Sequence, residues 1–128
     1  MNITIKSIIK NSTDKIFVEY STPYGDGVSE FIGSTPEENQ SYDVELNIDD
    51  DFIWGENLTP STKNAASIHF DLGKSYITAE LIAIEDDDCG ALKIGNSISL
   101  VSIKKNHHDL PLFVDIISKK VSLHPTNI

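Results

Sequence analysis

The amino-acid sequence predicts an all-β protein of one domain, residues 1–128, folded as a small, partly open barrel of the OB or SH3 type. Three observations support this prediction. Apolar residues recur with a period of two, turn-forming residues recur roughly every 8–12 residues, and no stretch of a dozen residues keeps the 3.6-residue period of a helix. About eight short strands and little helix are expected. A β-sandwich is the alternative architecture.

The first half of the chain is expected to contain four strands. Each combines β-branched or aromatic residues with the alternation that gives a strand one buried and one solvated face. They cover residues 2–6, 16–20, 28–32 and 42–48. Residues 24–27 contain two glycines and an aspartate, and are expected to form the hairpin connection before the third strand.

The second half repeats this pattern, with strands expected at residues 67–70, 75–85, 91–94, 97–104, 112–117 and 119–123. The segment 110–120 is ambiguous, because several of its apolar residues could also line one face of a helix. Its β-branched content and Pro111 favour strand. A single helical turn is expected at residues 34–40, where Pro and Glu follow Ser and Thr.

The charge composition limits the kinds of partner. The chain has 10 Lys, no Arg and 20 Asp and Glu, a formal net charge of −10. Such a chain is poorly suited to bind nucleic-acid backbones or anionic membranes, because each phosphate contact needs a cation. Residues 1–60 carry 12 acids and 3 Lys (−9), whereas residues 61–128 carry 8 acids and 7 Lys (−1). This asymmetry indicates one acidic region rather than a uniformly acidic surface.

The sequence also indicates a compartment. Cys89 is the only cysteine, which excludes an intrachain disulfide and agrees with a reducing cytoplasm. Residues 1–17 lack the apolar core of a signal peptide, and the longest aliphatic run, residues 81–84, is far shorter than a membrane span. A cytoplasmic protein without a membrane partner is therefore expected.

The first candidate binding site surrounds the only tryptophan. Asp49, Asp50, Asp51 and Glu56 flank Trp54, which is the composition of an aromatic anchor surrounded by carboxylates that attract a basic partner. The alternative is a solvated turn with Trp54 in the core.

The second candidate is the acidic run Glu85, Asp86, Asp87 and Asp88. It is expected to form either an acidic hairpin loop or a loop that contacts a partner. Its spacing does not match a calcium-binding loop of the EF-hand type, so no metal is expected there.

His107, His108 and Asp109 form the third cluster considered, as a zinc site or a general base. Adjacent strand residues point to opposite faces, so the two histidines of a regular strand could not reach one metal. No catalytic, metal or cofactor site is therefore expected, and the protein is not expected to be an enzyme.

Residues 42–55 and 84–98, with the tail 123–128, resemble small acidic all-β bacterial proteins of toxin–immunity loci, including those of contact-dependent growth inhibition. The resemblance implies a cytoplasmic immunity protein that binds and neutralises one cognate toxin domain, often a nuclease. Nucleases bind polyanions and have basic clefts, which an acidic protein could occlude. This physical argument independently favours a basic protein partner.

Three other functions are weighed. A small barrel could bind single-stranded nucleic acid by stacking bases on Tyr20, Tyr24, Phe31 and Tyr42, but cations are few. A small enzyme could use the cluster at residues 107–109. A regulatory or structural subunit of another complex would use the same kind of acidic surface as an immunity protein.

Overall fold

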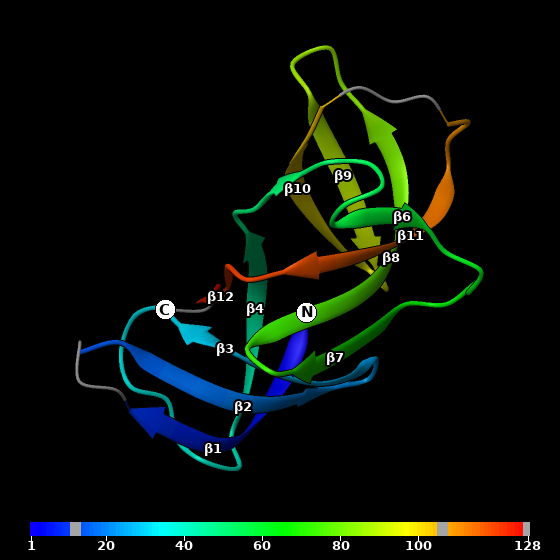
Figure 1. Cartoon of the computed structure of the whole chain (residues 1–128). Helices are drawn as coiled ribbons and strands as arrows, with labels where there is room; N and C mark the ends of the chain where they lie inside the picture. The colour runs from blue at the N-terminus through cyan, green and yellow to red at the C-terminus, as the bar shows by residue number, and fades with distance from the viewer. Residues whose placement is uncertain (11–13, 105–107, 127–128) are drawn as a thin grey trace.

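The computed structural model describes residues 1–10, 14–104 and 108–126, and within these ranges the protein is all-β, without helix (Figure 1). It has twelve strands: β1 (Asn2–Lys10), β2 (Ile16–Thr22), β3 (Gly25–Phe31), β4 (Ser41–Ile48), β5 (Asp51–Phe52), β6 (Leu58–Pro60), β7 (Ser67–Asp71), β8 (Lys74–Ile84), β9 (Cys89–Ile94), β10 (Ser97–Ile103), β11 (Leu112–Ser118) and β12 (Val121–Pro125). The all-β prediction is confirmed. The described chain offers no helix with the length and apolarity that crossing a bilayer requires.

The twelve strands exceed the expected number of about eight, in part because β5 and β6 are only two and three residues long. A two-residue period cannot show in so short a segment. The helical turn expected at residues 34–40 is wrong. The end of that segment pairs with β1 instead: Asn39 N–H donates to Ile5 O at 2.7 Å, and Ile5 N–H donates to Gln40 O at 2.9 Å. The preference for strand at residues 110–120 is confirmed by β11, which pairs with β8 along its whole length.

Five strands close the predicted barrel, in the order β1-β2-β3-β12-β4 and back to β1. The spatial order β4-β1-β2-β3 is a Greek key, and β12 completes the cycle between β3 and β4. The closing pair is parallel, with Ser122 beside Glu30 and Leu123 beside Phe31. In Figure 1 this barrel occupies the lower part of the view. The barrel is closed, where the sequence predicted a partly open one.

Six of the seven remaining strands form a second curved layer in the order β6-β11-β8-β9-β10-β5, and the seventh, β7, also pairs with β8. β8 is its centre: β11 lies along one edge, while β7 and β9 share the other. An isolated bridge between Trp54 and Leu58 links the chain just after β5 to β6. β6, β9 and β10 lie at the top of Figure 1.

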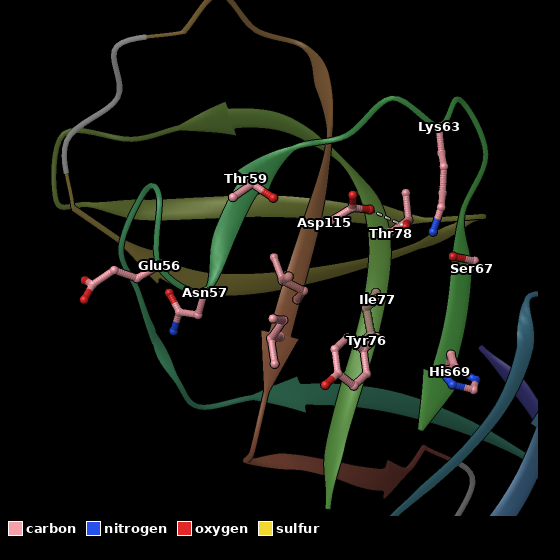
Figure 2. A pocket seen from close by; sticks show the side chains of 12 residues that line it. Glu56, Asn57, Thr59, Lys63, Ser67, His69, Tyr76, Ile77, Thr78 and Asp115 are labelled. Carbon is pink, nitrogen blue, oxygen red and sulfur yellow. Dashed lines mark hydrogen bonds between the residues drawn. The ribbon is translucent and has the colours of Figure 1, made fainter. Parts of the chain in front are cut away.

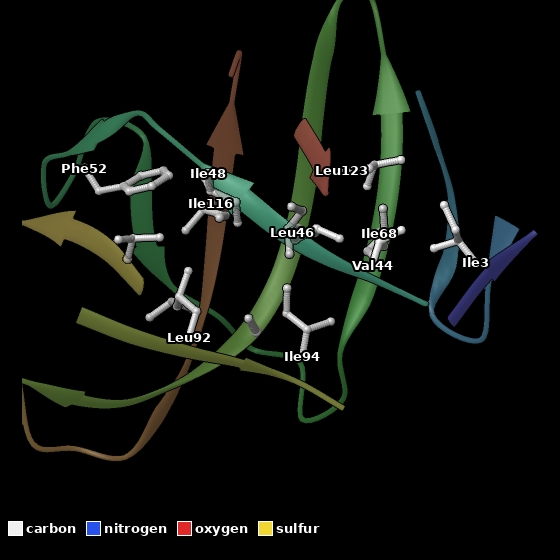
Figure 3. Close-up of a cluster of buried hydrophobic side chains, with 14 of the residues drawn as sticks. Ile3, Val44, Leu46, Ile48, Phe52, Ile68, Leu92, Ile94, Ile116 and Leu123 are labelled. Carbon is white, nitrogen blue, oxygen red and sulfur yellow. The ribbon is translucent and has the colours of Figure 1, made fainter. Parts of the chain in front are cut away.

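One buried hydrophobic cluster runs through both groups of strands (Figure 3). The alternation predicted for residues 42–48 is confirmed, since Val44, Leu46 and Ile48 are buried while their neighbours Asp43, Glu45 and Asn47 are exposed. The second layer contributes side chains such as Phe52, Leu92 and Ile116 to the same interior. Burial of this shared apolar surface is the main term that holds the two layers together.

Candidate functional site

Strand β10 brings the two predicted acidic clusters together. Its Ser102 pairs with Cys89 of β9 on one side and, in parallel, with Asp51 of β5 on the other. The next residue, Ile103, donates its N–H to Asp88 O at 3.0 Å. Two interstrand spacings, about 10 Å, therefore separate the strand ends that carry the 49–51 and 85–88 clusters.

The second cluster is a tight, solvated loop between β8 and β9. Asp88 N–H donates to Glu85 O at 3.1 Å, and Glu85 N–H donates to Cys89 O at 2.9 Å. Asp88 has a φ of 60°, which Asp tolerates better than most residues. The side chains of Glu85, Asp86, Asp87 and Asp88 are all exposed, and none has an ion-pair partner among the described residues. Their charges are available to an incoming partner.

The first cluster divides into one structural and two exposed carboxylates. Asp50 accepts hydrogen bonds from the Ser118 hydroxyl and, at 2.9 Å, from the Lys119 N–H, and so it holds the turn between β11 and β12. The side chains of Asp49 and Asp51 are exposed. Of the three adjacent aspartates, Asp49 and Asp51 are therefore the ones placed to meet a partner directly.

The position of Trp54 agrees with the alternative interpretation of this segment, a solvated turn whose tryptophan packs against the core. Its side chain is partly buried against the hydrophobic cluster, and its ring lies 4.3 Å from the His108 ring, centroid to centroid, at 35°. The indole Nε1 is buried, and the described part of the chain gives it no hydrogen-bond acceptor. Glu56 is exposed but lines a separate pocket, and His107 lies outside the described residues. Trp54 is thus a packing residue rather than an exposed anchor.

Two exposed apolar side chains on β10 are not among the candidate residues predicted from the sequence. Ile98 is 57% exposed and Leu100 is 65% exposed. They share the outward face of β10 with Ser102, while Val101 and Ile103 face the core. A strand with apolar residues on both faces is the sequence signal that could have identified them.

Acidic residues of β4 flank this apolar pair on another side. Ile98, Glu45 and Asp43 line one hollow of about 300 Å³. Asp43 accepts a hydrogen bond from the Met1 ammonium at 3.2 Å, and this ammonium lowers the pKa of its carboxyl group. Glu45 is exposed and without an ion-pair partner among the described residues. We use the name β10 surface for Ile98 and Leu100 together with Glu45, Asp51, Glu85, Asp86, Asp87 and Asp88.

No group of three or more His, Cys, Asp or Glu side chains within the described ranges is arranged to hold a metal ion. No protein-family model, curated protein or solved structure matches the chain.

Proposed function

We propose that this chain is an immunity-type inhibitor that binds one basic toxin domain, of the nuclease class, in the bacterial cytoplasm. It places the β10 surface over the active cleft of the toxin, and its carboxylates stand where the phosphates of the substrate would bind. The observation that carries the proposal is that both acidic clusters meet at the Ser102 end of β10, the strand that also exposes Leu100 and Ile98, the latter paired with the exposed Lys93.

Electrostatic steering supports a basic partner. Asp51 and the loop 85–88 lie about 10 Å apart, close to the Debye length of about 8 Å at physiological salt, so a protein approaching them meets one combined field. A net charge of −10 adds a long-range component to this field. Such an arrangement accelerates association with a basic surface and opposes pairing with a second copy of the same chain.

The apolar pair supplies the short-range part of the interaction. Side chains with more than half of their area exposed, as in Ile98 and Leu100, bury apolar surface when a partner covers them. Affinity in protein complexes is set mainly by dissociation, and buried apolar anchors slow it. Charged side chains beside an apolar pair, here mainly carboxylates with Lys93 next to Ile98, match the usual division of an interface into rim and core.

Two of the four aromatic residues that could stack on nucleic-acid bases are buried. Tyr20 is 1% exposed and Phe31 is 4% exposed, so neither ring can stack on a base. The hydroxyl of Tyr42 accepts a hydrogen bond from Glu37 N–H at 2.9 Å, and its ring packs edge-on against Phe31. A regulatory subunit remains the second candidate, because it would use the same β10 surface.

Co-expression tests the proposal directly. The probe is the C-terminal domain of the protein encoded immediately upstream, produced with and without this chain. We expect the domain alone to stop growth, and we expect growth to be restored and the two chains to purify together when both are present. A harmless domain that binds this chain would favour a regulatory subunit. Failure to co-purify at low and at moderate salt would contradict both roles for that pair.

A further inference from the structure

A second hollow lies on the outer face of β7, β8, β11 and β6, away from the β10 surface (Figure 2). Strand register arranges its lining in two rows across these strands. The polar row consists of Ser67, Thr78, Asp115 and Thr59. The second row consists of His69, Tyr76 and Ile117. The rows are two residues apart along each strand, about 7 Å.

The polar row holds hydroxyl and carboxylate groups in fixed positions. The hydroxyl of Thr78, a residue only 2% exposed, donates to Asp115 Oδ1 at 2.6 Å, which leaves Asp115 Oδ2 as an acceptor for a ligand. The hydroxyls of Ser67 and Thr59, on either side, can donate or accept. In the second row, Tyr76 is 37% exposed, and its ring lies 6.2 Å from the His69 ring, centroid to centroid, so it offers an accessible aromatic surface.

The ammonium of Lys63, the carboxylates of Glu56 and Asp115 and the imidazole of His69 surround this hollow. Figure 2 shows Lys63 and His69 on one side, Glu56 on the other and Asp115 between them. None of these four side chains forms an ion pair within the part of the chain that the structure describes. The lining thus mixes groups that only donate, groups that only accept and groups that do both.

We infer that this pocket binds a neutral, hydroxyl-rich ligand, a mono- or disaccharide. A ligand hydroxyl both donates and accepts, so one kind of group satisfies the Lys63 ammonium, the Asp115 carboxylate and the threonine and serine hydroxyls. The apolar face of a sugar ring lies on Tyr76, while its edge reaches the polar row. The volume, about 430 Å³, is within the range of small-molecule sites.

Charged ligands match this lining less well. An anion would meet the carboxylates of Asp115 and Glu56, and a cation would meet the ammonium of Lys63. The inference does not depend on the proposed function, because the two sites share no residue. Failure of the toxin domain to bind would not contradict the sugar site, and failure of sugars to bind would not contradict the proposed inhibitor function.

Amide NMR spectra of the ¹⁵N-labelled full chain, titrated with D-glucose, N-acetylglucosamine and maltose, test the inference. Choline and inorganic phosphate serve as charged probes. We expect at least one sugar to shift amides of β6, β7, β8 and β11 at millimolar concentration. Absence of any sugar-dependent shift, or tighter binding of choline or phosphate at these amides, would overturn the inference.

Four variants locate the binding. Tyr76→Ser removes the ring and should weaken sugar binding about tenfold, whereas Tyr76→Phe should retain it. Asp115→Asn keeps an acceptor for the Thr78 hydroxyl but removes the charge, and should also weaken binding about tenfold. Asp87→Asn is the matched control on the β10 surface and should have no effect. Equal sugar affinity for Tyr76→Ser, Asp115→Asn and the unmodified chain would contradict the site.

Discussion

Gly25 is a residue at which the backbones of the barrel and the second layer lie in close contact. Its φ is +134°, and a Cβ added there would overlap the carbonyl oxygen of Ile68. It is also the residue through which β3 pairs with β7. Neither the backbone conformation nor the close approach is compatible with a side chain.

Gly25→Ala should therefore lower the free energy of unfolding by about 3 kcal/mol, because backbone strain and a steric overlap act together. Urea unfolding measures this loss. Gly33→Ala is the matched control: its φ is +108°, but nothing lies within 4 Å of the added Cβ, so only the strain remains. Equal losses of stability for the two variants would show that steric overlap with Ile68 does not contribute to the effect of Gly25→Ala.

Asp50 and Asp49 are adjacent but should behave differently. Asp50→Ala removes the acceptor for the Ser118 hydroxyl and the Lys119 N–H, and we expect a loss of about 1–2 kcal/mol in unfolding free energy. Asp49→Ala removes an exposed carboxylate and should change stability by less than about 0.5 kcal/mol. Thermal unfolding of both variants checks this, and equal stability would mean that Asp50 is not the structural member of the pair.

The candidate site could be predicted only in part at the level of residues. The acidic clusters were identified because carboxylates in runs are visible in composition. Trp54 was considered as an anchor, but composition does not show which side of a turn faces the core, and here the ring packs between the hydrophobic cluster and His108. The sequence places Ile98 and Leu100 in a strand but does not show which face of that strand is exposed, because β10 carries apolar residues on both faces.

At the scale of elements, β10 determines where a partner can bind. One face of the strand completes the core through Val101 and Ile103, and the other presents Ile98 and Leu100 to solvent. Its pairing with both β9 and β5 positions the acidic groups at the Ser102 end of this outward face, while Lys93 of β9 lies beside Ile98.

The double variant Ile98→Ser, Leu100→Ser should leave stability within about 0.5 kcal/mol of the unmodified chain, because both side chains are already exposed. Dissociation from the toxin domain should be faster by about tenfold or more, because the apolar anchors are lost. Surface plasmon resonance measures this rate. Leu72→Ser, at a residue 89% exposed outside the β10 surface, is the control and should leave the dissociation rate unchanged. Unchanged dissociation of the double variant would exclude β10 from the interface.

The elements themselves follow closely from alternation, with exceptions that have physical causes. The strands β4, β8, β10 and β11 carry enough alternating or β-branched residues to be predicted. β5 and β6 are defined by long-range pairing with β10 and β11 rather than by local pattern. The meeting of the two acidic clusters depends on these same long-range pairs, so local sequence could not predict it.

At the scale of the whole molecule, the barrel should be sensitive to alkaline pH through Tyr20. Burial raises the pKa of its hydroxyl above the usual value, with an opposing contribution from the hydrogen bond to Ser29. The folded state therefore holds this proton more tightly than the unfolded state. Its contribution to stability is complete below the unfolded pKa of about 10 and is lost as pH rises toward the folded pKa.

Tyr20→Phe should therefore lose stability less steeply than the unmodified chain above about pH 10. At neutral pH it should be less stable by about 1 kcal/mol, because the hydrogen bond to Ser29 is absent. Chemical unfolding at a series of pH values measures both effects, with Tyr76→Phe, at an exposed tyrosine, as control. Parallel pH profiles for Tyr20→Phe and the unmodified chain would contradict this role.

The charge of the whole molecule is also the basis of the proposed function. Residues 1–60 carry a net charge of −9 and residues 61–128 a net charge of −1, which predicts an acidic region in the first half. The carboxylates of the β10 surface, however, come from both halves. The β10 surface takes Glu45 and Asp51 from the acidic half and the loop 85–88 from the nearly neutral half.

The decisive measurement is the association rate constant between this chain and the domain used as the co-expression probe, determined by stopped flow over a range of ionic strength. Two variants are compared, and each loses four negative charges. One carries Asp51→Asn, Asp86→Asn, Asp87→Asn and Asp88→Asn; the other carries Asp14→Asn, Glu37→Gln, Glu38→Gln and Asp71→Asn. If the β10 carboxylates steer the partner, only the first variant should associate about tenfold more slowly at low salt and with a weaker dependence on salt. Equal rates and equal salt dependence for the two variants would contradict such steering.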